Sequence, residues 1–270
     1  MDVGLRDKVA IVTGAGGVIC GEIADILASE GAAVALWDID FDAAERRAAH
    51  IRGTTGRAVA FRCDVTDRES VEEAMEAVPA EFGTIDILVN GAGGTSPDST
   101  TSETLGFFDL EPEALQAAMS LNWLGAVLPS QAVGRVFAAK GSGAILNVSS
   151  VAGDRPLTRV IAYSNAKAAL NSFTRWLAVY MATEYSPRIR VNAIAPGFVM
   201  TAQNKFLLVD EQTGEATDRG RKIVEAVPMA RYGEPREIAE VAVWLVSDRA
   251  SFITGAVIPI DGGLSAYAGV

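Results

Sequence analysis

The feature that most constrains the fold is an alternation between short apolar runs and longer amphipathic segments. The apolar runs that predict buried strands are 9–12, 33–37, 58–62, 85–89, 144–148, 190–194 and 256–260. The patterns that predict helices start near Ile19 and after Asp67, and cover about 41–51, 113–139, 161–184 and 236–247. Alternation of this kind is typical of right-handed crossovers between parallel strands. Continuous apolar strands are expected where helices cover both faces of the sheet. The sequence therefore predicts an α/β fold, with a doubly wound parallel sheet of seven strands.

The 270 residues show no internal repeat and no linker, so we expect one domain over residues 1–270. The segment 198–227 breaks the alternation and is richer in polar residues. In a sheet of this type, ligands bind outside the carboxyl ends of the strands. We therefore expect segment 198–227 to form a substrate lid over that edge.

Composition excludes several classes of function. The formal charge of −11 disfavours nucleic acid and anionic membranes as partners. Two cysteines and one histidine exclude a disulfide scaffold and a Cys/His metal cluster, so no metal site is expected. No apolar run reaches the ~18 residues of a membrane span, and the N-terminus lacks the pattern of a signal peptide. We expect a cytoplasmic protein whose partner is a small molecule.

A glycine cluster between the first strand and the first helix predicts a phosphate cradle. Gly14, Gly16 and Gly17 allow a close approach of the backbone, and the helix N-terminus favours an anion. Asp38 ends the second strand, where an acidic side chain binds the 2′-hydroxyl of an adenine ribose. An acidic residue there repels a 2′-phosphate, so NAD is expected rather than NADP. The competing interpretation is that Asp38 caps the following helix.

A second cluster predicts acid–base chemistry. Tyr163 and Lys167 are four residues apart in a predicted helix, so they share a face. A nearby ammonium group lowers the pKa of a phenol toward neutrality. Ser150 follows the strand 144–148 and leads Tyr163 by thirteen residues. We expect the three side chains to meet at one site.

With these residues the chain resembles the short-chain dehydrogenase/reductase family over nearly its whole length. The landmarks occur in the family's order: Thr13-Gly14, Asp64-Val65, Asn90-Gly91-Ala92-Gly93, Leu121-Asn122, Ser150 with Tyr163 and Lys167, Pro196-Gly197, and Asp261-Gly262-Gly263. The resemblance implies a Rossmann fold, an NAD-dependent oxidoreductase and a homotetramer. An exposed Leu264 and Tyr267 near the C-terminus would suit an interface between subunits.

The resemblance also implies roles for individual residues. Tyr163 would be the general acid/base, and Ser150 would bind the reacting oxygen. Lys167 would lower the pKa of Tyr163 and hold the nicotinamide ribose, and Asn122 would anchor a water beside Lys167. The cofactor would be bound by Tyr163 and Lys167 together with Gly14, Gly16, Gly17, Val18, Ile19, Asp38, Asp64, Val65, Asn90, Ala92, Gly93, Pro196, Gly197, Val199 and Thr201.

The glycine loop departs from the family pattern at two positions. In Thr-Gly-x-x-x-Gly-x-Gly, the second and third glycines become Val18 and Cys20. Because a β-branched residue disfavours a positive φ, we expect a negative φ at Val18. Cys20 should pack on the first strand as a small apolar residue.

The substrate is indicated by a closer likeness, to a branch of the family described as D-mannonate oxidoreductases or fructuronate reductases. Phe107-Phe108-Asp109-Leu110 and Arg155-Pro156-Leu157-Thr158 are among the stretches that carry it. Such a substrate needs a cation for its carboxylate and polar partners for its hydroxyls. The residues that could supply them are Arg155, Gln203, Asn204 and Lys205. Another polyol, gluconate or 3-oxoacyl reductase is the alternative enzyme, and a non-catalytic NAD-binding regulator is the alternative of a different class.

Overall fold

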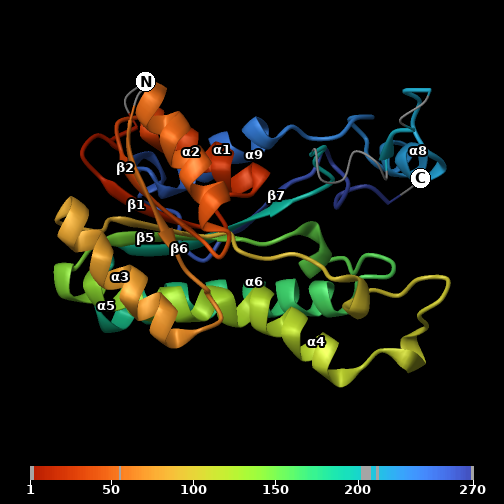
Figure 1. Cartoon of the computed structure of the whole chain (residues 1–270), viewed down its shortest axis with the longest axis horizontal. Helices are drawn as coiled ribbons and strands as arrows, with labels where there is room; N and C mark the ends of the chain where they lie inside the picture. Colours follow the sequence, from red (N-terminus) through yellow and green to blue (C-terminus); the bar gives the residue numbers. More distant parts are fainter. Residues whose placement is uncertain (1–2, 55, 202–207, 211–212, 269–270) are drawn as a thin grey trace.

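Seven parallel strands form one sheet in the order β3-β2-β1-β4-β5-β6-β7 (Figure 1). The structure is a computed structural model that describes residues 3–54, 56–201, 208–210 and 213–268. The strands are β1 (Val9–Thr13), β2 (Ala33–Asp38), β3 (Arg57–Arg62), β4 (Ile87–Asn90), β5 (Gly143–Val148), β6 (Ile189–Pro196) and β7 (Val257–Ile260). Each of the seven predicted strands is present, within two residues of its expected ends. The predicted α/β fold is confirmed.

Helices cover both faces of the sheet. One face carries α1 (Val18–Ser29), α2 (Phe41–Thr54) and α9 (Pro235–Val246). The other face carries α3 (Arg68–Phe82), α4 (Pro112–Met119), α5 (Gly125–Lys140) and α6 (Ile161–Glu184). A further helix, α8 (Asp218–Ala226), lies in the segment expected to be a lid. Among the described helices, none is long and apolar enough to cross a membrane.

Two apolar cores explain why the strands are apolar on both faces. In β1, Ala10 and Val12 pack into the core beneath α1 and α9, whereas Val9 and Ile11 belong to the core beneath α3, α5 and α6. Alternate side chains of a strand point to opposite faces, so a strand covered on both sides must be apolar at every position.

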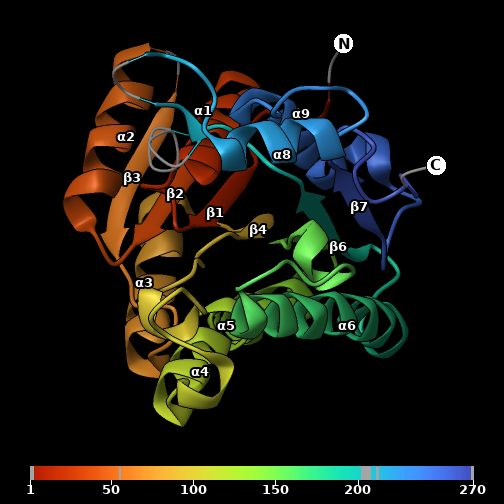
Figure 2. The same ribbon diagram turned by 90° about the vertical axis from the view of Figure 1, so that its right-hand side faces the viewer.

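The strand order reverses beside β1. The chain runs outward from β1 through β2 to β3, and then returns to β4 on the other side of β1. Figure 2 shows the strands in this order, with β3 and β7 at opposite edges. The loops after β1 and β4 therefore diverge and leave a crevice at the carboxyl edge, where this type of sheet binds ligands.

The helix predicted over 113–139 is not continuous. A π-helical segment, Ser120–Leu124, separates α4 from α5. Within it Asn122 donates through Nδ2 to the carbonyl oxygen of Ala118 at 2.9 Å. Such wide turns are frequent at functional sites. The spacing of apolar residues in the sequence did not indicate the π-helical segment, because one extra residue in a helical turn shifts that spacing only slightly.

Candidate active site

The glycine loop between β1 and α1 turns tightly against the end of β4. Gly14 has a φ of 66°, and a Cβ there would lie 2.8 Å from the Cα of Ala92. Thr13 fixes this contact, because its Oγ1 accepts hydrogen bonds from the backbone N–H of Gly91 and of Ala92. Helix α1 then begins at Val18, which lies outside the left-handed region as expected. The helix N-terminus therefore faces the crevice, where it favours an anionic group.

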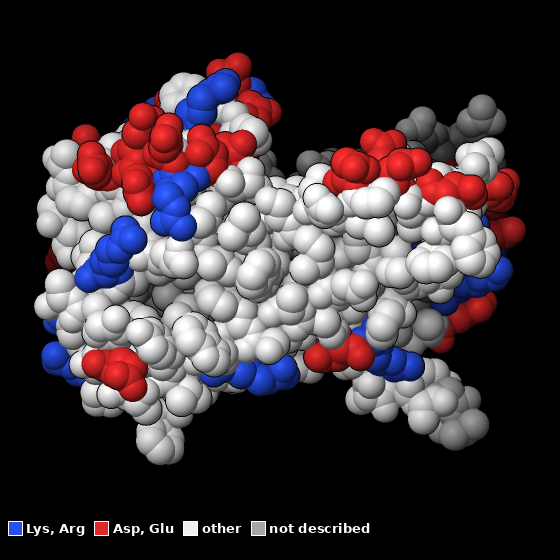
Figure 3. Space-filling view, turned by 90° about the horizontal axis from the view of Figure 1, so that it is seen from below, with Lys and Arg blue, Asp and Glu red and all other residues white. Residues whose placement is uncertain are grey.

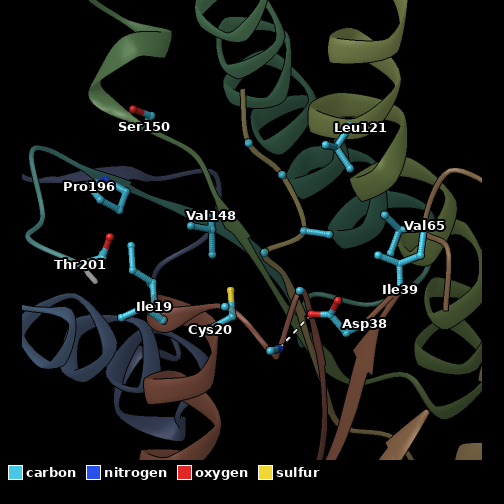
Figure 4. A pocket seen from close by; sticks show the side chains of 18 of the residues that line it. Ile19, Cys20, Asp38, Ile39, Val65, Leu121, Val148, Ser150, Pro196 and Thr201 are labelled. Carbon is cyan, nitrogen blue, oxygen red and sulfur yellow. Dashed lines mark hydrogen bonds between the residues drawn. The ribbon is translucent and has the colours of Figure 1, made fainter. Parts of the chain in front are cut away.

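Asp38 joins the end of β2 to the glycine loop. Its Oδ2 accepts a hydrogen bond from Gly16 N at 2.9 Å, which Figure 4 shows as a dashed line. Asp40 rather than Asp38 caps α2, because its Oδ1 accepts a hydrogen bond from Ala43 N in the first turn of that helix. Asp38 lines the crevice, where its carboxylate can accept a hydrogen bond from a ribose hydroxyl.

The crevice is a cleft of about 790 Å³ that runs from Asp38 to Tyr163. Most of the cofactor residues expected from the sequence line it: Gly14, Gly16, Gly17, Val18, Ile19, Asp38, Asp64, Val65, Ala92, Gly93, Tyr163, Lys167, Pro196, Gly197, Val199 and Thr201. Figure 4 shows Asp38 and Ser150 in different parts of this cleft. The set fits NAD: glycines and a helix N-terminus for the diphosphate, apolar Val65 for a base, and an acidic residue for a ribose.

The three residues predicted for acid–base chemistry meet at the other end of the cleft. Ser150 lies two residues after the end of β5. Tyr163 and Lys167 lie in the first two turns of α6. The Ser150 and Tyr163 side chains lie close enough for the Ser150 hydroxyl to lower the pKa of the Tyr163 phenol. Lys167 Nζ donates to the carbonyl oxygen of Val148 at 2.8 Å and lies 5.5 Å from the centroid of the Tyr163 ring.

The protonation of these groups follows from burial. Burial raises the pKa of the Tyr163 phenol, and the hydrogen bond with Ser150 lowers it by less. The expectation that Lys167 brings this pKa toward neutrality is therefore not met in the structure. Burial also lowers the pKa of Lys167 to about 8, with Cys20 acting in the opposite direction. Lys167 is 4% exposed, so its charge is held by Val148 O and the cleft rather than by bulk water.

Asn122 does not line the cleft; it is buried behind it and bonds to the glycine segment after β4. Its Oδ1 accepts from Gly94 N at 3.0 Å, and its Nδ2 donates to Gly94 O at 2.8 Å. A Cβ on Gly93 would lie 2.7 Å from this Oδ1 and 3.4 Å from Lys167 Nζ. The π-helical segment therefore places Asn122 close to Lys167, at a position that only a glycine neighbour permits.

Cys20 fills space that Gly91 leaves open. The thiol is 4% exposed and belongs to the core that contains Val12, as the sequence predicted. A Cβ on Gly91 would lie 2.0 Å from Cys20 Sγ. Burial raises the pKa of this thiol to about 12, although Lys167 acts to lower it. The departure of the glycine loop at position 20 is thus matched by a glycine at position 91.

Two sequence expectations need correction. The Asn90 side chain does not line the cleft, because its Nδ2 donates to Ser130 Oγ and to Asn147 Oδ1 in the interior. Arg155 does not line it either, because its Nη1 donates to the carbonyl oxygens of the C-terminal residues Leu264, Ser265 and Tyr267. Leu264 is half-buried rather than exposed, whereas Tyr267 is 44% exposed. Gln203, Asn204 and Lys205 lie outside the described residues.

Several cleft residues were not expected from the sequence. They are Ile39, Asp40, Ala43, Arg46, Cys63, Gly94, Leu121, Val148, Ser149 and Phe198. Ile39 is 61% exposed, and an apolar residue directly after Asp38 was a signal for a base-binding surface. Arg46 gave no signal, because it resembles any arginine on the polar face of a helix.

Comparisons with known proteins agree with this site. The sequence profile of a family described as enoyl-(acyl carrier protein) reductase matches residues 14–265. An uncharacterized oxidoreductase of Haemophilus influenzae is 42% identical, over 98% of this chain and 96% of its own length. D-threitol dehydrogenase of Mycolicibacterium smegmatis is 38% identical, over 97% of this chain and 94% of its own length.

A solved structure shows the same architecture. The crystal structure of a candidate D-mannonate oxidoreductase from Haemophilus influenzae, with bound NAD, superposes with a TM-score of 0.92 at 41% identity. The match covers 99% of this chain and 98% of that chain. Profile, relatives and structure agree over nearly the full length. The chain belongs to the short-chain dehydrogenase/reductase family.

Proposed function

We propose that this NAD-dependent oxidoreductase interconverts the secondary alcohol and the ketone of a sugar acid, with D-mannonate and D-fructuronate as the pair. The observation that carries the proposal is the single cleft that holds Asp38 at one end and Ser150, Tyr163 and Lys167 at the other. An alcohol oxidation needs a nucleotide site beside an acid–base group, and the cleft offers both.

The residues of the cleft would divide the chemistry as follows. Asp38 and the glycine loop would hold NAD, which would supply the acceptor for the hydride of the alcohol carbon. The Tyr163 phenolate takes the hydroxyl proton, and the Ser150 hydroxyl donates a hydrogen bond to the same oxygen. Lys167 donates to Val148 O in this structure and, once turned from it toward the cofactor, would stabilise the phenolate by the positive charge that it carries below pH 8. It would exchange its bond to Val148 O for one to the nicotinamide ribose.

The choice of a sugar acid rests on the branch resemblance and on the candidate D-mannonate oxidoreductase at 41% identity. D-threitol dehydrogenase at 38% identity favours a polyol as the second candidate. Segment 198–227 would close over either substrate as a lid, since Val199 and Thr201 already line the cleft and α8 follows. Lys205, Gln203 and Asn204 are the proposed partners of the carboxylate and hydroxyls.

Absorbance at 340 nm tests the proposal directly. The purified protein is supplied with NAD and, separately, with D-mannonate, D-gluconate, D-threitol and a 3-hydroxyacyl thioester. We expect the highest kcat/KM with D-mannonate. Preference for any of the other three would replace the substrate while keeping the oxidoreductase. NAD binding by calorimetry with no turnover of a broad alcohol panel would favour the non-catalytic regulator.

We also propose that the protein is a homotetramer. The face formed by α5 and α6 carries an apolar groove, and Trp176, 59% exposed, stacks on Tyr180 there with ring centroids 4.9 Å apart. Figure 3 shows that the middle of this side of the molecule has few charged residues. A second copy would cover this surface, and Tyr267 offers a separate exposed aromatic side chain. Light scattering tests it: four subunits are expected, and a monomer would refute the proposal.

A further inference from the structure

The C-terminal turn, which we define as residues 261–267, contacts the chain segment that follows β6. Gly197 N donates to the carbonyl oxygen of Ile260 at 2.9 Å. A Cβ on Gly197 would lie 2.8 Å from the Cα of Asp261. Since Gly197 lines the cleft, the start of the turn lies directly behind the nicotinamide end of the site.

The same turn contacts the segment that leaves α8. Met229 N donates to the carbonyl oxygen of Gly262 at 3.1 Å. A Cβ on Gly262 would lie 2.7 Å from Val227 Cγ1. The C-terminal turn therefore supports the end of the proposed lid.

Arg155 provides the third contact. Its Nη1 donates to Leu264 O at 2.7 Å, and to Ser265 O and Tyr267 O at 3.4 Å each. A guanidinium group only donates hydrogen bonds, and carbonyl oxygens accept them. The partial negative charges of these three oxygens therefore hold the positively charged Arg155 side chain at the turn. An arginine held in this way is directed toward the C-terminal turn, not toward a substrate carboxylate.

Both partners of this contact have hydrogen bonds of their own. In the turn, Asp261 accepts through its carboxylate from Gly263 N at 2.9 Å and from Ser265 N at 2.7 Å. In the loop, Arg155 N donates to Val151 O, and Ser150 Oγ accepts from Ala152 N at 3.1 Å. A hydrogen-bonded stretch of backbone, residues 151–155, therefore connects Arg155 with Ser150.

We propose that Arg155 is a positioning residue for the reaction: it fastens the C-terminal turn to the Ser150 loop, so that the turn holds together the catalytic serine, the segment after β6 and the end of the lid. The kinetic consequences rest on the proposed oxidoreductase function, whereas the structural coupling does not. Arg155 acts through Ser150, which lines the cleft together with Tyr163 and lowers the pKa of its phenol.

The test is Arg155→Ala, examined by hydrogen exchange and by kinetics. Faster amide exchange is expected in three separate segments: 151–155, 228–230 and 262–267. With whichever of D-mannonate and D-threitol is turned over, kcat should fall roughly tenfold with little change in KM, because a displaced catalytic group lowers the rate of the chemical step. The acidic limb of the kcat profile for alcohol oxidation should move to higher pH, because a displaced Ser150 no longer lowers the pKa of Tyr163.

Two further variants make the result decisive. Arg155→Lys keeps a cation that can reach a carbonyl oxygen and should restore part of the protection and of kcat. Arg6→Ala removes an exposed arginine that precedes β1, at the amino ends of the strands and away from the cleft. This control variant should change neither the amide protection nor kcat. Exchange that rises only within 262–267 would overturn the coupling. A loss confined to KM for the anionic substrate would also overturn it, since Arg155 would then contact the carboxylate itself. A failure to turn over any sugar acid or polyol would refute the proposed function, while the exchange data would still decide the coupling.

Discussion

The two halves of the cleft are built from different kinds of chain segment. In the cofactor half, Asp38 at the end of β2 accepts a hydrogen bond of 2.9 Å from Gly16 in the loop after β1. Behind the substrate half, outside the cleft itself, Arg155 in the loop after β5 donates one of 2.7 Å to Leu264 in the C-terminal turn. The cofactor half consists of strand ends, whereas the substrate half consists of loops, the lid segment and the C-terminal turn.

This difference predicts that changes in the loops affect the two halves unequally. Strand ends are fixed by the sheet, so residues beside them keep their positions when the loops change. Loops are positioned by contacts with other loops, so a change in one of them alters the substrate half without disturbing the cofactor half. The variants below test whether the two halves are independent to this degree.

The largest effect is expected at Tyr163. Tyr163→Phe removes the proton acceptor and should lower kcat by at least ~10³-fold, because acid–base catalysis and stabilisation of the reacting oxygen are lost together. NADH binding, followed by fluorescence titration, should be nearly unchanged, since the cofactor half is intact. A variant with turnover near that of the wild type would exclude Tyr163 as the acid/base.

A smaller effect, on the stability of the fold, is expected where Cys20 contacts Gly91. Gly91→Ala places a Cβ 2.0 Å from Cys20 Sγ, and an overpacked core of this kind costs about 1–3 kcal/mol of stability. Urea denaturation measures this cost. The double variant Cys20→Gly with Gly91→Ala removes the clash and should be more stable than Gly91→Ala alone. If Gly91→Ala costs the same in both backgrounds, positions 20 and 91 are not coupled.

A still smaller effect is expected at Asp38, on the preference for NADH over NADPH. Asp38→Ala removes an acceptor for the ribose hydroxyl and a charge that repels a 2′-phosphate. The kcat/KM ratio of NADPH to NADH should rise roughly tenfold, the worth of one charge-assisted hydrogen bond. Asp42→Ala is the matched control, because it removes the same charge from an exposed position in the first turn of α2 that does not line the cleft. An unchanged ratio in Asp38→Ala would remove Asp38 from the ribose site.

The sequence predicted the fold and most of the cofactor half because both depend on local patterns. Apolar runs identify strands, and Asp38 and the glycine loop are recognised from their places at strand ends. Tyr163 and Lys167 follow from helical spacing. The seven strands were confirmed, and the cleft contains all the expected cofactor residues except Asn90.

The remaining features depend on contacts between distant segments. Asn90 turns inward because Ser130 and Asn147, 40 and 57 residues away, accept from its amide. The π-helical segment at Asn122 is stabilised by Gly94, 28 residues earlier. Arg155 is directed away from the cleft by the C-terminal turn. Since sequence spacing carries no information about such partners, side-chain direction was predicted less well than the backbone.

The smallest predicted effect concerns Lys167, at the catalytic end of the cleft. Burial lowers its pKa from 10.5 to about 8 in the folded protein. Between these values the unfolded chain binds more protons, so stability should rise with pH. Lys167→Met removes this contribution, and the difference in stability between wild type and variant should shift by about 1 kcal/mol from pH 8 to pH 9. Urea denaturation without added nucleotide measures it. Cys20 and Cys63, each with a pKa raised to about 12 by burial, act with the opposite sign but are present in both proteins, so their contribution largely cancels. A difference that is constant with pH would show that Lys167 keeps its ordinary pKa, and that the cleft stabilises its charge despite burial.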